Sequence, residues 1–63
     1  MPTRETIFEY QIVGNFGRVN AIDVATGIEV SVSVPAGCAK VYREQLALRR
    51  LDRELASNSH IKK

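Results

Sequence analysis

A cysteine, a histidine, one glutamate and one glycine-containing loop are the features of this sequence that could support chemistry. Cys38 has no base beside it in the sequence, and His60 is the only histidine of the chain and lies in a polar tail. We expect Glu44 to reach the rim of the core rather than to act as a general base. The loop Gly14-Asn15-Phe16-Gly17 joins two expected strands, so it is not a phosphate loop, which must lead into a helix. We therefore predict that the protein is not an enzyme and binds no metal ion or cofactor.

The length and composition predict one small domain over residues 1–63, with disordered tails at 1–5 and 57–63. A single cysteine rules out an internal disulfide and fits a reducing compartment. No apolar run approaches the roughly 20 residues of a membrane span, and no signal peptide precedes the first expected strand. We therefore expect a cytoplasmic protein that does not associate with membranes.

Charge is unevenly divided along the chain. Residues 1–39 contain two arginines and four carboxylates, giving −2, whereas residues 40–63 contain seven basic and three acidic side chains, giving +4. One explanation is that cations are favourable near the C-terminus of a helix. The other is that this half of the chain meets an anionic partner.

Three stretches alternate between apolar and polar residues, which predicts strands at about 6–13, 16–23 and 28–34. Gly14-Asn15 predicts a two-residue hairpin turn, although Gly17 leaves a four-residue loop open. We expect Asp23 to accept hydrogen bonds from the amides of Ala25 and Thr26, and Gly27 to adopt a left-handed conformation. The strands then share one apolar face made of Phe8, Tyr10, Ile12, Val19, Ala21, Ile28, Val30, Val32 and Val34.

A helix is predicted from about residue 39 to about residue 56, because apolar residues recur there at helical spacing. The buried stripe of this helix is expected to contain Val41, Ala47, Leu48, Leu51 and Leu55. The stripe and the apolar sheet face are the two large hydrophobic surfaces, and each must cover the other. The predicted fold class is therefore α+β, a three-stranded antiparallel β-meander packed against one C-terminal helix.

Several apolar residues are left outside this core. Four of them fall on the opposite face of the sheet, namely Ile7, Val13, Phe16 and Ile22, and Leu46 is expected roughly opposite the buried stripe, among arginines. Cross-strand apolar pairs can simply stabilise a hairpin in solvent. They can also form an interface, and both outer strands are open edges. The first hypothesis is a small non-catalytic interaction module that self-associates as a homodimer or docks on a protein partner.

The alternative hypothesis is nucleic-acid binding through an arginine-rich face of the helix. The residues concerned are Arg43, Arg49, Arg50 and Arg53. Positive charge gathered on one side suits phosphate contacts. A solvated charged face explains the same pattern, and no aromatic residue lies between the arginines to stack on bases.

The chain resembles a family of short uncharacterised alphaproteobacterial proteins that share a domain of unknown function. The resemblance covers most of residues 6–55 and depends on Ile7-Phe8-Glu9, Val13-Gly14, Arg18-Val19, the stretch from Ala21 to Val30, Pro35-Ala36 and Ala47-Leu48-Arg49-Arg50-Leu51. It implies a β-β-β-α fold but no activity and no functional residues. The order of elements is also similar to the latter part of double-stranded-RNA-binding domains, although here only Lys40 stands where that family has a lysine cluster.

Overall fold

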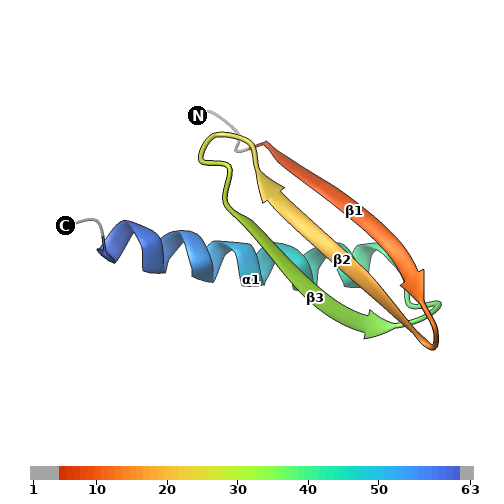
Figure 1. Cartoon of the computed structure of the whole chain (residues 1–63). Coiled ribbons are helices and arrows are strands. Elements are labelled where there is room, and N and C mark those ends of the chain that lie inside the picture. The colour runs from red at the N-terminus through yellow and green to blue at the C-terminus, as the bar shows by residue number, and fades with distance from the viewer. Residues whose placement is uncertain (1–4, 62–63) are drawn as a thin grey trace.

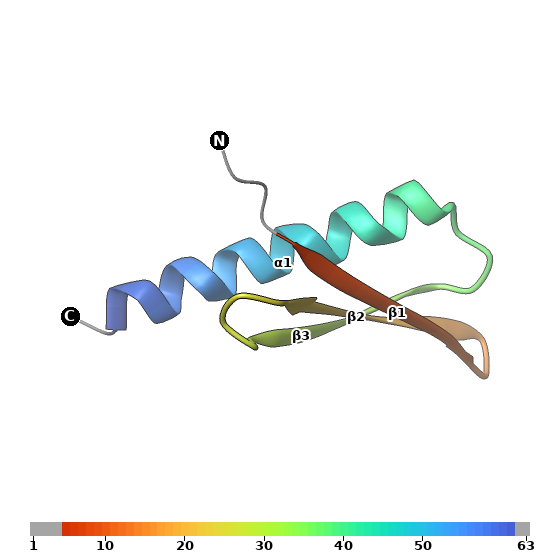
Figure 2. The same cartoon turned by 90° about the horizontal axis from the view of Figure 1, so that it is seen from above.

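The computed structural model describes the backbone of residues 5–61 and the side chains of residues 5–57. Three antiparallel strands form one sheet in the order β1-β2-β3, and a single helix packs against one face of it (Figure 1). The view from above shows the sheet and the helix as two layers (Figure 2). The predicted α+β fold is confirmed. The elements are β1 (Thr6–Val13), β2 (Phe16–Asp23), β3 (Glu29–Pro35) and α1 (Lys40–Ile61).

The turn between β1 and β2 is the two-residue loop expected from the sequence. Val13 pairs with Phe16, so only Gly14 and Asn15 lie between the strands. Gly14 has a φ of 62°, whereas Asn15 does not have a positive φ, which matches the backbone of a type II′ hairpin turn. The four-residue alternative is therefore wrong, and the register follows from the short turn.

The turn between β2 and β3 is organised by Asp23, whose side chain is only 1% exposed. Its Oδ2 accepts hydrogen bonds from the Thr26 amide (3.1 Å) and the Thr26 hydroxyl (2.8 Å). Gly27 adopts the expected left-handed conformation, with a φ of 76°, and its amide donates to the carbonyl oxygen of Asp23 at 2.8 Å. The predicted turn is thus confirmed at Thr26 and Gly27, and it closes with the Asp23 amide donating to the Ile28 carbonyl oxygen at 2.9 Å.

The helix packs over β2 and β3 and crosses the strands at an angle (Figure 1). The buried core accordingly comes from these three elements and consists of Val19, Ala21, Val30, Val34, Ala47 and Leu51. None of the eight residues of β1 is fully buried. Ile12 is 55% exposed, so the prediction that it lies in the core is wrong. It points to the expected side of the sheet, but the helix does not cover that part.

The helix begins at Lys40 and extends five residues beyond the predicted end at 56. Ser57 and Asn58 have modest helix propensities, but no glycine or proline follows to stop the helix. The predicted tails at 1–5 and 57–63 lie partly outside the described residues, and 57–61 belongs to α1. Val41 is 67% exposed, so its assignment to the buried stripe is wrong. Ten residues at about 100° each place it about 80° around the helix from Leu51.

Tyr10, Gly17 and Arg43 form a stack that joins β1 to the rest of the domain. Gly17 is buried because the Tyr10 ring lies over it: a Cβ at position 17 would be 2.5 Å from Cε1 of Tyr10. The guanidinium carbon of Arg43 lies 3.7 Å from the centroid of the same ring. The ring is therefore held between the backbone of β2 and a side chain of α1.

We predict that Gly17→Ala lowers the free energy of unfolding by about 1–3 kcal/mol, because the added methyl group must displace the Tyr10 ring. Urea denaturation followed by circular dichroism measures this change. In a Tyr10→Val background the same substitution should cost much less, because the ring is gone. Equal stability of Gly17→Ala and the unmodified protein would contradict the close packing.

Candidate protein-interaction surface

The most exposed strand of the sheet is β1. It carries three large apolar side chains that are open to solvent, Ile7 (48%), Ile12 (55%) and Val13 (36%). Ile7 and Val13 are on the outer face and Ile12 is on the face toward the helix, so the strand exposes apolar side chains on both faces. Its edge also pairs with no described element. An edge strand with apolar residues on both faces is a surface that another chain can extend.

The outer face of the sheet has the cross-strand pairs that the sequence predicts. Ile7 lies opposite Ile22, and Val13 lies opposite Phe16, which is 37% exposed. These pairs are at the two ends of the hairpin. A polar band separates them, in which the Ser31 hydroxyl donates a hydrogen bond to Oδ1 of Asn20. The outer face therefore presents two small apolar patches rather than one large one.

Leu46 does not lie on the solvent side of the helix as predicted. It is half-buried and packs against the core, because the helix crosses the sheet at an angle and its flank meets β3. Together with Val32 it forms the apolar part of an open hollow of about 230 Å³. The remaining residues that line the hollow are Arg49, Arg50 and Arg53.

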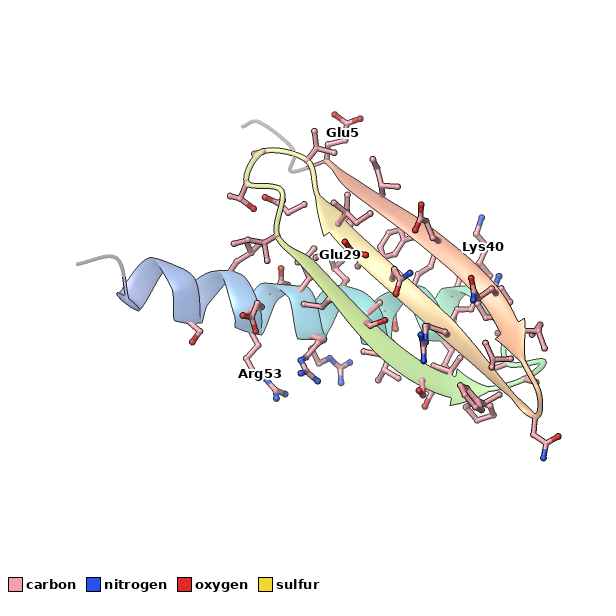
Figure 3. All side chains as sticks on the ribbon, in the orientation of Figure 1. Glu5, Glu29, Lys40 and Arg53 are labelled. Carbon is pink, nitrogen blue, oxygen red and sulfur yellow. The ribbon has the colours of Figure 1, made fainter. Side chains whose placement is uncertain are left out.

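The four arginines of the predicted basic face are not equivalent. Arg43 is half-buried, stacks on Tyr10 and donates a hydrogen bond from Nη1 to the carbonyl oxygen of Cys38 at 3.3 Å. It therefore has a structural role at the start of the helix, and its assignment as a nucleic-acid contact stays a prediction. Arg53 instead projects away from the sheet (Figure 3), and it lines the hollow together with Arg49 and Arg50. Sequence spacing alone could not show which arginine would meet an aromatic ring of β1.

The residues considered for chemistry are dispersed. Cys38 is half-buried in the loop before α1, and Glu44 is half-buried on the helix. Within the described part of the chain, no group of three or more His, Cys, Asp or Glu side chains could hold a metal ion. The side chain of His60 lies outside the described residues.

Among the described helices none has the length and apolar character needed to cross a membrane.

The fold and this surface define a small α+β domain with a three-stranded meander, one covering helix and an open edge strand. Comparison with protein families matches residues 3–58 to the domain of unknown function DUF6898, and the chain belongs to that family. A search of curated proteins and a search of solved structures find no match. The resemblance to a family of unknown function is thus confirmed, whereas an alphaproteobacterial origin and a relation to double-stranded-RNA-binding domains stay predictions.

We predict that Arg43→Ala lowers the free energy of unfolding by about 0.5–2 kcal/mol, because it removes the stacking on Tyr10. Arg53→Ala is the matched control, since Arg53 is exposed on the same helix, and it should change stability by less than about 0.5 kcal/mol. Urea denaturation of both variants makes the comparison. Equal effects of the two substitutions would show that the stack contributes nothing to stability.

Proposed function

We propose that this domain is a non-catalytic protein-interaction module and that its docking element is β1 with the adjoining apolar patches of the outer face. The observation that carries the proposal is that none of the eight residues of β1 is fully buried, although β1 presents three exposed apolar side chains. A domain of 63 residues has little apolar surface to spare for exposure. Covering these side chains with a partner is favourable by roughly 25 cal/mol per Å² of apolar area.

The edge of β1 also lacks the features that usually prevent strand addition. The strand is eight residues long, contains no proline or lysine, and its pairing with β2 is continuous without a bulge. Glu9 is its only charged residue. By contrast, β3 ends in Pro35, and Val32 on its inner face lines a hollow together with arginines of α1. A partner strand is therefore expected to form main-chain hydrogen bonds with the open edge of β1 rather than with the open edge of β3.

Site-specific photo-cross-linking in the cells that produce the protein tests this proposal. A benzophenone side chain at position 7 or 16 should yield defined covalent adducts, because both positions are in the exposed apolar patches. The matched control is the same group at position 45, since Gln45 is exposed on the helix. Equal labelling from all three positions, or no adduct from positions 7 and 16, would count against the proposed docking element.

Phe16→Ser should reduce this cross-linking from position 7 strongly while lowering the free energy of unfolding only modestly. Phe16 is 37% exposed, so its contribution to the core is small. Adduct yield and urea denaturation are compared for the same variant. A large loss of stability with unchanged adduct yield would indicate that the outer pairs serve the fold alone.

Nucleic-acid binding is the second candidate, and the specific observation that favours it is the hollow lined by Arg49, Arg50 and Arg53. Three guanidinium groups around one hollow suit contacts to successive phosphates. Fluorescence anisotropy with short RNA and DNA probes at about 50 mM and about 200 mM salt tests it. Binding should weaken steeply with salt and be lost when all three arginines are replaced by alanine. Arg18→Ala, on the outer face, is the control. Absence of binding at low salt would end this candidate.

A further inference from the structure

We propose that the partner of β1 is a second copy of this chain, paired antiparallel along β1 with Tyr10 opposite Tyr10. This inference depends on the proposed function, which it makes specific by naming the occupant of the edge. The two copies would form one continuous six-stranded sheet with both helices on the same face. The direction of the free main-chain groups of β1 and the side chains that each register brings together support this pairing.

The free hydrogen-bonding groups of β1 belong to its inward-facing residues. Val13 and Phe16 flank a two-residue turn, so they form a hydrogen-bonded pair. Hydrogen-bonded and non-hydrogen-bonded pairs alternate along an antiparallel ladder. The main-chain N–H and C=O groups of Phe8, Tyr10 and Ile12 therefore point to the open edge. A second β1 strand can therefore hydrogen-bond to both the N–H and the C=O group of each of these three residues.

The register with Tyr10 at its centre matches apolar residues on the inner face. Phe8 of one copy then lies opposite Ile12 of the other, and the two Tyr10 residues are neighbours. Phe8 and Tyr10 are only half-buried and Ile12 is 55% exposed, because the helix packs over β2 and β3. Pairing two copies places these uncovered side chains next to one another, where each shields its neighbour from water.

The same register matches the outer face as well. Ile7 of one copy lies opposite Val13 of the other, and Ile22 and Phe16 already flank these residues within each chain. The result is a continuous apolar row across four strands, in the order Ile22, Ile7, Val13, Phe16, with the last two from the second copy. Symmetry produces this row twice. The two small patches that are separate in one chain therefore become parts of larger ones.

Neighbouring registers do not have this complementarity. A shift of two residues in one direction places Glu9 opposite Glu9, and like charges directly opposite are destabilising. A shift in the other direction places Glu9 opposite Val13 and Phe8 opposite Gly14. In the proposed register Glu9 lies opposite Gln11, so no two charged side chains of β1 face each other. The same strand thus specifies both its partner and its alignment, as a two-fold symmetric interface requires.

Sedimentation of the 63-residue chain tests the dimer, over a range of about 10 μM to about 1 mM because a single strand pair makes a small interface. The critical variant carries an N-methyl group on the Tyr10 amide, which blocks the edge and leaves every side chain intact. Chemical synthesis can supply it, because Cys38 permits joining two segments. The matched control is N-methylation of Ser33, whose amide points to the open edge of β3 by the same alternation.

We expect the unmodified chain and the Ser33 control to dimerise, and the Tyr10 N-methyl chain to remain monomeric with an unchanged circular dichroism spectrum. A monomer at about 1 mM for the unmodified chain, or a dimer that survives N-methylation of Tyr10, would overturn the inference. If cross-linking from position 7 captures a different protein while the purified chain is monomeric, the inference fails and the proposed function stands. If neither adducts nor dimers form, both fail.

The register has its own test in a double-mutant cycle of Glu9→Lys and Gln11→Lys. Gln11→Lys places an ammonium group opposite Glu9 of the other copy, twice per dimer, and should tighten the dimer about two- to thirty-fold. Adding Glu9→Lys should reverse this gain, because two cations then face each other. Gln11→Lys also places an ammonium group opposite Arg18 within each chain. This repulsion is present with and without Glu9→Lys, so it cancels in the cycle. A coupling of zero would exclude this alignment.

Discussion

A single helix packs over only part of the three-stranded sheet, and the exposure of β1 follows from this incomplete cover. Three strands are about 14 Å wide and a helix with its side chains is about 10–12 Å across. Because α1 also crosses the strands at an angle, its C-terminal turns project past the sheet (Figure 1). The buried core therefore lies between α1, β2 and β3, and β1 contributes no fully buried side chain to it.

The stack of Arg43, Tyr10 and Gly17 partly compensates for this incomplete cover. The Tyr10 ring reaches from β1 across to the backbone of β2 at Gly17, and Arg43 closes it from the helix side. Arg43 also donates a hydrogen bond to the Cys38 carbonyl oxygen and so ties the loop to the first turns of α1. An aromatic ring and a guanidinium group thus attach the edge strand to a domain whose aliphatic core does not reach it.

The residues that remain exposed on β1 are the basis of the interaction module proposed above. The apolar residues at the two ends of its outer face, Ile7 and Val13, pair with Ile22 and Phe16 of β2. On the inner face Ile12 lies open to solvent. A partner strand along β1 would extend both faces at once, whereas a partner on the outer face alone would meet a polar band between two small patches.

The strands, and the face of the sheet to which each of their side chains points, follow from the sequence alone. Alternating polarity predicted β1 and β2 at their observed limits, and the local chemistry of Asp23 and Gly27 predicted the turn between β2 and β3. The cross-strand pairs Ile7–Ile22 and Val13–Phe16 follow once the turn between β1 and β2 has two residues, which is one of the two lengths that the sequence allows. These features are short-range, because each depends on residues that are near in the chain or joined through a tight turn.

Which residues of the inner sheet face are covered depends on how the helix packs, and the sequence pattern does not specify this. Whether Ile12 is buried depends on where the helix lies across the sheet, and periodicity contains no information about that position. The roles of Leu46 and Arg43 changed for the same reason, since the flank of α1 meets β3 at one residue and Tyr10 of β1 at the other. Local patterns specify the direction of a side chain, whereas its burial depends on packing between elements that are distant in the sequence.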